Sequence, residues 1–111
     1  MIVDVPDNAR LLKEEIFGPV AALQAFDNDE DMIAKANDTE YGLAAYLYTG
    51  DLKRGLRISE RLEAGMVGLN RGLVSDVAAP FGGVKQSGLG REGAHHGLLE
   101  FTECKYIAVN W

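Results

Sequence analysis

Short apolar runs of strand length alternate with segments of helical spacing along the first 70 residues. The apolar runs are Val20–Phe26, Ala44–Tyr48 and Met66–Asn70, and the segments between them cover residues 27–38 and 51–65. Short apolar runs bounded by turn residues are typical of buried strands, and repeats of three or four residues are typical of helices. Strands that alternate with helices through short links favour a parallel sheet. The chain is therefore predicted to be an α/β protein with a βαβαβ core.

Both expected helices carry end signals. The acidic run Asp27–Asp31 supplies an N-cap and negative charge for the positive helix end, and this helix should stop near Asn37. Asp51 can cap the second helix. Its helical spacing comes from Leu52, Leu56, Ser59 and Leu62. Gly65 is expected to be the left-handed residue that ends it.

The second half of the chain has less periodicity. Residues 71–90 show none, and seven of the 13 glycines fall between Gly72 and Gly97, so a long shaped loop is expected there. A helix is predicted over Glu92–Phe101, and a last strand over Lys105–Val109. We therefore divide the chain into a main part, residues 1–102, and a terminal strand segment, residues 103–111. Residues 1–19 are expected to form loops and extended segments.

Composition narrows the possible functions. The net charge of −6 disfavours non-specific binding to nucleic acid or to an anionic membrane. No apolar run approaches the roughly 20 residues that span a bilayer, and no secretory signal is visible at the N-terminus. The single cysteine, Cys104, cannot form an internal disulfide, which fits a reducing compartment and a cytoplasmic location.

Three apparent motifs are interpreted as structural. Gly88–Gly93 spells G-x-G-x-x-G, but no hydrophobic strand precedes it and too little chain follows for a dinucleotide fold. His95 and His96 are adjacent and cannot share a metal in the i, i+4 manner. Cys104 follows Glu103, with no base or helix N-terminus to activate a thiol. We expect a glycine turn, two surface histidines and a structural thiol.

The segment Glu14–Pro19 is open to two interpretations. Two acids precede Phe17, which lies beside the stiff pair Gly18-Pro19, so the bend could present Glu15 and Phe17 to a cleft. Taken on the residues alone, solvent-facing acids and a core phenylalanine are the alternative.

Two segments carry a family resemblance. Glu15–Pro19 resembles the E-x-F-G-P segment of the aldehyde dehydrogenase superfamily, and Pro80–Glu92 resembles its P-F-G-G-x-K-x-S-G-x-G-R-E block. The order and separation also match, and the resemblance covers essentially the whole chain. Asn70–Ser75 and Leu99–Tyr106 resemble the succinate-semialdehyde dehydrogenase branch. Val77 stands where that branch suggests proline, which puts the shape of the loop around Ser75 in question.

The resemblance implies a role for four residues. Glu15 corresponds to the acid that accepts hydrogen bonds from the nicotinamide-ribose hydroxyls, and Phe17 to an aromatic beside the nicotinamide of NAD or NADP. Phe81 corresponds to an aromatic of the aldehyde pocket, and Ser75 to a residue that binds the distal carboxylate of the substrate. The final strand is expected to join subunits of a homo-oligomer.

The resemblance also implies that the chain is a C-terminal fragment. The family's catalytic cysteine and general-base glutamate precede the E-x-F-G-P segment, so no catalytic residue is assigned here and the chain alone should be inactive. Two alternatives stay open: a fragment of an aldehyde dehydrogenase with another substrate, and a non-catalytic module that only folds or associates.

Overall fold

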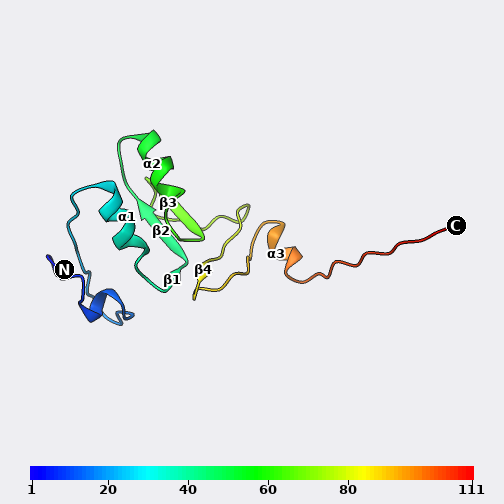
Figure 1. Ribbon diagram of the computed structural model, residues 1–111, viewed down its shortest axis with the longest axis horizontal. Helices are drawn as coiled ribbons and strands as arrows, with labels where there is room; N and C mark the ends of the chain where they lie inside the picture. Colours follow the sequence, from blue (N-terminus) through cyan, green and yellow to red (C-terminus); the bar gives the residue numbers. More distant parts are fainter.

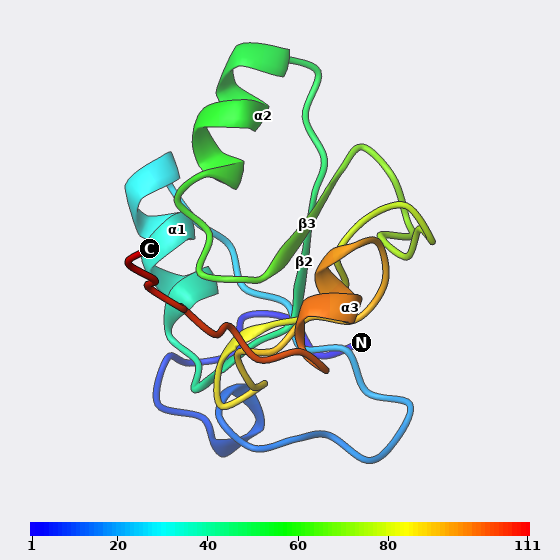
Figure 2. The same ribbon diagram turned by 90° about the vertical axis from the view of Figure 1, so that its right-hand side faces the viewer.

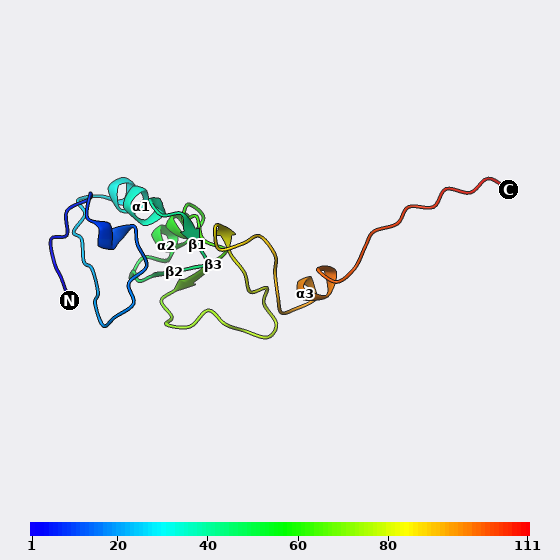
Figure 3. The same cartoon turned by 90° about the horizontal axis from the view of Figure 1, so that it is seen from below.

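The computed structural model describes residues 1–111 as a small α/β body with a long extended tail (Figure 1). A parallel pair of strands, β2 (Ala44–Leu47) and β3 (Met66–Leu69), runs through the body. Helices α1 (Asp29–Asn37) and α2 (Leu52–Ser59) lie on the same side of this pair (Figures 2 and 3). The predicted β-α-β unit over residues 44–69 is confirmed, with Ala44 opposite Met66 and Leu47 opposite Leu69.

The predicted caps begin both helices. The Asn28 side chain accepts a hydrogen bond from the Asp31 amide at 3.0 Å, and the Asp51 carboxylate accepts one from the Arg54 amide at 3.0 Å. Each cap satisfies an amide that the first helical turn leaves without a partner. Helix α1 ends at Asn37, as predicted.

Ion pairs join the two helices. The Asp29 carboxylate accepts hydrogen bonds from Arg54 at 2.5 Å and from Arg57 at 2.6 Å, and Glu30 accepts two from Arg61 at 2.6 and 2.5 Å. The hydrogen bond from Arg54 is the main reason that the pKa of Asp29 lies below its ordinary value, with Arg57 adding to it. Two arginines of α2, and Arg61 just after it, therefore pair with the first turn of α1.

A second, antiparallel pair was not expected from the sequence. Strand β1 (Tyr41–Gly42) pairs with β4 (Val84–Lys85), so the glycine-rich segment returns to the residues just after α1. Only a 3-10 turn, η1 (Arg10–Leu12), forms within the first 20 residues.

Three sequence predictions about regular structure are wrong. The run Val20–Phe26 is no strand of the sheet. It meets the chain start through a single bridge, Ile2 to Ala22, where the Ile2 amide donates to the Ala21 carbonyl at 2.8 Å. The run therefore lies beside the N-terminal segment, and no hydrophobic pattern in the sequence predicted this pairing.

Helix α2 stops at Ser59, whose hydroxyl donates to the Gly55 carbonyl at 2.8 Å, and Gly65 is not left-handed. Glycine is needed at position 65 for another reason. A Cβ there would lie 2.0 Å from the Gly82 carbonyl oxygen, so the backbones of residues 65 and 82 approach too closely for a side chain.

Within the segment Glu92–Phe101, which was predicted to be one helix, only α3 (His96–Leu99) is helical. Gly93 and Ala94 have φ of +74° and +47°, and two left-handed residues in succession cannot continue into a right-handed helix.

The terminal segment Lys105–Val109 forms no strand. It extends away from the body without any hydrogen-bonding partner (Figure 1). A strand needs a partner strand, and this segment pairs with no residue of the chain, so its expected pairing with a second subunit stays a prediction.

Very little of the chain is buried. Eight of 111 residues are, and the apolar ones are Val5, Ile33, Ile58 and Met66. The accessible surface is 8767 Å², whereas a compact protein of this mass exposes about 6,000 Å². The radius of gyration is 18.3 Å, against about 13 Å for a compact domain of this length. Most of the apolar side chains thus lack a covering layer. No helix has the length and apolar character needed to cross a membrane.

Candidate functional site

The glycine-rich loop of residues 81–92 is closed on itself by its own backbone. The Phe81 amide donates to the Glu92 carbonyl at 2.7 Å, and the Glu92 amide donates back to Phe81 at 2.8 Å. One guanidinium nitrogen of Arg91 donates to the carbonyls of Gly83, Leu89 and Gly90 at 2.7, 2.9 and 2.9 Å. Glycine-rich backbone carries many free carbonyls, and Arg91 satisfies three of them. The loop therefore has a defined shape despite its composition.

The first cavity lies in this loop and has a volume of about 430 Å³. Phe81 is half-buried in its wall, with Ser87, Arg91 and Leu43 beside it. Its wall thus combines an aromatic ring, a hydroxyl, one cation and the two acids Glu92 and Glu100.

The second cavity, of about 290 Å³, lies between the N-terminal segment and β1. Glu15 and Tyr41 line it together with Lys13 and Thr39. The negative charge and hydrogen bonding of Glu40 raise the pKa of Tyr41, and the charge of Glu15 adds to the rise. Glu15 and Tyr41 therefore line the same cavity and interact through charge.

Ser87 lines both cavities. Its hydroxyl oxygen accepts a hydrogen bond from the Gly42 amide at 3.0 Å, which fixes the side chain against β1. Glu15 and Phe81, which the sequence placed in two separate motifs, thus lie in two cavities with a common wall at Ser87.

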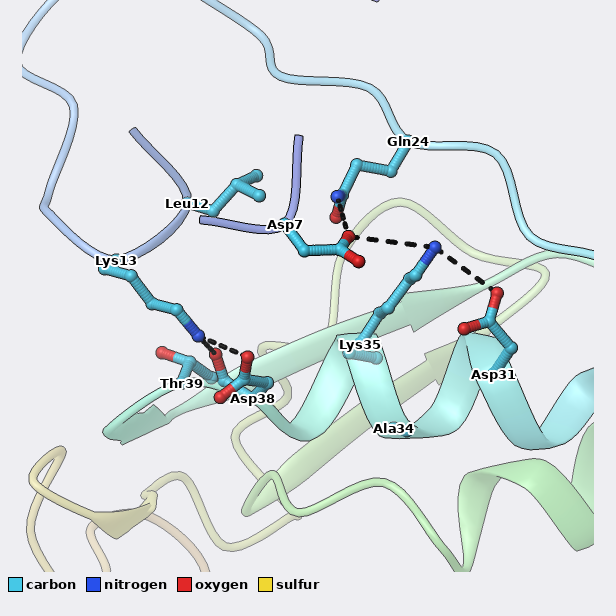
Figure 4. A pocket seen from close by; sticks show the side chains of 10 residues that line it. Asp7, Leu12, Lys13, Gln24, Asp31, Ala34, Lys35, Asp38 and Thr39 are labelled. Carbon is cyan, nitrogen blue, oxygen red and sulfur yellow. Dashed lines mark hydrogen bonds and ion pairs between the residues drawn. The ribbon is translucent and has the colours of Figure 1, made fainter. Parts of the chain in front are cut away.

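A third cavity, of about 490 Å³, lies beside α1 and is lined by side chains that form ion pairs with one another (Figure 4). The Lys35 ammonium lies 3.3 Å from the Asp31 carboxylate and 3.9 Å from that of Asp7. It also donates a hydrogen bond to the Ala25 carbonyl at 3.2 Å. Lys13 forms a second ion pair, with Asp38. Because each lysine already has a carboxylate partner and three aspartates face two lysines, this cavity offers no free cation to an anionic ligand.

The structure does not bring all four predicted site residues together. Phe17 is 92% exposed, and neither it nor Ser75 lines either of the two cavities. Ser75 is exposed and precedes the turn at Asp76–Ala79, where the Asp76 carboxylate accepts from the Ala78 amide at 2.9 Å.

Two cavity residues were missed by the sequence analysis. Ser87 lies within the recognised motif, so the motif itself could have marked it. Tyr41 lies outside both motifs, and only the β1–β4 pairing places it.

Of the three motifs interpreted as structural, Cys104 and the histidine pair lie apart from both cavities, whereas the Gly88–Gly93 segment lines the first cavity through Gly88, Gly90, Arg91 and Glu92. Cys104 is exposed in the tail. The His95 and His96 rings lie 4.0 Å apart, and no group of three or more His, Cys, Asp or Glu side chains forms a metal-binding arrangement. Gly88 and Gly93 both have positive φ, and the segment between them has a bend at Leu89 and the bridge residue Glu92 in place of the expected turn.

Comparison with known proteins decides the family. Residues 1–107 match the family model described as the aldehyde dehydrogenase family. The chain belongs to this family. Among curated aldehyde dehydrogenases, the succinate-semialdehyde dehydrogenase of Paenarthrobacter nicotinovorans is 56% identical to the chain over 109 residues. The aligned residues are 98% of the chain and 24% of that protein. The chain is 54% identical to the succinate-semialdehyde dehydrogenase [NADP(+)] of Escherichia coli K12, over 98% of the chain and 23% of that protein.

A third relative acts on a different aldehyde. The glutarate-semialdehyde dehydrogenase of Pseudomonas putida is 51% identical to the chain, over 99% of the chain and 23% of that enzyme. The chain therefore spans less than a quarter of the length of the curated relatives it matches.

Solved structures of the family share the fold. An NADP-dependent enzyme from E. coli superimposes with a TM-score of 0.89 and 53% identity, over 98% of this chain and 23% of that one. The NAD+ complex of an aldehyde dehydrogenase from Bacillus cereus superimposes with the same score and 46% identity, over 97% of this chain and 22% of that one.

Proposed function

We propose that residues 1–111 act as the C-terminal part of an NAD(P)+-dependent dehydrogenase that oxidises succinate semialdehyde to succinate. The observation that carries the proposal is the common wall of the two cavities: Glu15 lines one, Phe81 lines the other, and Ser87 lines both. Oxidation of an aldehyde by a nicotinamide cofactor needs two molecules side by side, and adjoining cavities provide for that.

The residues of the Glu15 cavity fit the ribose of a nicotinamide cofactor. A carboxylate accepts hydrogen bonds from two adjacent hydroxyl groups, and the charge-assisted bonds that result are among the stronger ones. The one cation in the cavity wall, Lys13, is paired with Asp38 and does not neutralise Glu15. Glu15 would hold the ribose, and Phe17 would limit the tilt of the nicotinamide. When bound, the cofactor supplies the hydride acceptor.

Residues of this chain orient the reactants and supply no nucleophile. Cys104 is exposed in the tail, away from both cavities. The thiol that attacks the aldehyde and the base that activates water come from other parts of the enzyme, so residues 1–111 alone should be inactive. The tail, residues 103–111, would pair with a second subunit, which gives its unpaired backbone a partner.

Ser75 is proposed to bind the remote carboxylate of the aldehyde. Its hydroxyl is exposed and bonded to no other side chain, so it is free to donate. A relative that acts on glutarate semialdehyde favours a second candidate substrate, one methylene longer, which the same hydroxyl could serve.

A chimeric enzyme tests the proposal. Residues 1–111 replace the matching segment of the E. coli succinate-semialdehyde dehydrogenase, with which they share 54% identity. We expect the chimera to reduce NAD(P)+ with succinate semialdehyde, and to do so with a higher kcat/KM than with glutarate semialdehyde or an uncharged aldehyde. A soluble chimera with no activity on any aldehyde would contradict the proposal, and a preference for glutarate semialdehyde would select the second candidate.

Glu15→Gln in the chimera tests the cofactor contact. Losing one charge-assisted hydrogen bond costs about 1.5–3 kcal/mol, so hydride transfer should slow, or cofactor affinity should fall, by roughly ten- to a hundredfold. Glu60→Gln removes the same charge from an exposed glutamate that lines neither cavity and is the matched control. Equal rates and cofactor affinities in the two variants would reduce Glu15 to a surface acid.

A further inference from the structure

Lys85 occupies a strained position at the turn of the glycine-rich loop. Its φ is +55°, a left-handed conformation that a lysine adopts at a cost in conformational energy. In the β1–β4 pair it lies opposite Tyr41, and Phe81 and Ser87 lie four residues before it and two after it. A strained residue between the two cavity-lining side chains must be held by its surroundings.

The Lys85 ammonium is held by three acceptors. It donates to the carbonyls of Asn37 at 2.8 Å and Thr39 at 3.1 Å, and it lies 2.5 Å from the Glu63 carboxylate. The side chain is only 25% exposed. Asn37 is the last residue of α1, where the helix dipole is negative and the final carbonyls lack partners, so a cation is stabilised there.

Asn37, whose carbonyl accepts a hydrogen bond from Lys85, is held in place by its own side chain. The Asn37 side-chain amide donates to the Arg61 carbonyl at 2.9 Å, and its oxygen accepts from the Glu63 amide at 2.9 Å. The end of α1 and residues 61–63 therefore form one unit. All three acceptors of Lys85 lie on or beside that unit, and none belongs to the glycine-rich loop.

We propose that Lys85 is a positioning residue that fixes residues 81–92 between the two cavities. It acts through Phe81 and Ser87 and touches neither reactant. This inference rests on the proposed function for its catalytic consequence, whereas the holding of the loop does not depend on it.

The first test measures the loop directly by hydrogen exchange in the chimera. Lys85→Met keeps the unbranched stem and the same backbone strain but removes the charge and all three interactions. Lys53→Met removes the same charge from an exposed lysine with no side-chain bond and is the control. We expect amide exchange over residues 81–92 to rise by about tenfold in Lys85→Met only, because local opening becomes easier. Equal exchange in the two variants would overturn the inference.

The second test separates positioning from folding by the pre-steady-state burst of NAD(P)H. Lys85→Met should lower the burst rate constant by about tenfold while each subunit still gives a burst, and Lys85→Arg should recover most of the rate. A loss of burst amplitude with an unchanged rate constant would mean that Lys85 serves only folding. Raised exchange with an unchanged rate constant would also overturn the positioning role.

An insoluble Lys85→Met variant and an inactive unsubstituted chimera each call for a separate conclusion. If Lys85→Met is insoluble, Glu63→Gln removes one acceptor and should change exchange and burst rate in the same direction by a smaller factor. No change in either measurement would count against the inference. If the unsubstituted chimera reduces no cofactor, the proposed function fails. The exchange experiment then decides alone whether Lys85 holds the loop.

Discussion

Replacement of Gly65 by alanine would force a methyl group into the contact between two backbones. The new Cβ would lie 2.0 Å from the Gly82 carbonyl oxygen and 2.7 Å from the Gly83 Cα. Ordinary van der Waals contact begins near 3.4 Å, so the glycine-rich loop must move by more than 1 Å. Both neighbours are backbone atoms, and no side chain can rotate away. Overpacking of this kind costs about 1–3 kcal/mol.

Urea unfolding of the chimera measures this cost. Gly50→Ala is the control, because a Cβ there meets nothing within 4 Å, and such a substitution stabilises by about 0.4–1 kcal/mol through the unfolded state. The two variants should therefore differ by roughly 1.4–4 kcal/mol, with Gly65→Ala the less stable and with similar m-values. Coincident unfolding midpoints would show that the loop yields freely and that the close approach has no energetic consequence.

Three further predictions follow from the site and the surface. Ser75→Ala should lower kcat/KM for succinate semialdehyde by roughly tenfold and leave an uncharged aldehyde nearly unaffected; equal losses on both would mean that the residue only shapes the loop. Because Arg54 and Arg57 lower the pKa of Asp29 in the folded state, their ion pairs stabilise above its ordinary value of 3.8 and stop doing so as the pH falls through the lowered pKa. Asp29→Asn should thus reduce thermal stability at neutral pH, and its difference from the unsubstituted chimera should shrink progressively as the pH falls below 3.8. Removal of residues 104–111 should reduce the oligomeric state of the chimera in sedimentation experiments, and an unchanged state would exclude the tail as an assembly strand.

Local signals in the sequence located the central β-α-β unit. The caps expected within Asp27–Asp31 and at Asp51 and the apolar runs Ala44–Tyr48 and Met66–Asn70 depend on neighbours within a few positions. The structure has a cap at Asn28 and at Asp51 and a strand within each run. The errors occur where distant contacts decide. The run Val20–Phe26 forms a bridge with the start of the chain instead of joining the sheet. Glycine is needed at position 65 because the backbone of Gly82, 17 positions later, lies against it.

The candidate site shows the same division. Glu15 and Phe81 were located by motif, because each motif is continuous in sequence. The roles of Tyr41 and Lys85 depend on the short β1–β4 pair, and two-residue strands leave no periodic signal. Ser75 was located by resemblance alone, and its relation to the cavities depends on parts of the family fold that these 111 residues do not contain.

The parallel pair β2–β3 leaves an open edge on both of its strands. Its two strands are 22 positions apart in sequence, so pairing them closes a sizeable loop before any third strand can add its hydrogen bonds. A lone pair of strands is marginal in water, and exposed edges recruit other chains. We therefore expect this region to become ordered late during folding, on a template that other strands provide. Until then it would be a natural substrate for chaperones, so a substitution that slows β2–β3 pairing should lower the yield of soluble protein more than the activity of the molecules that do fold.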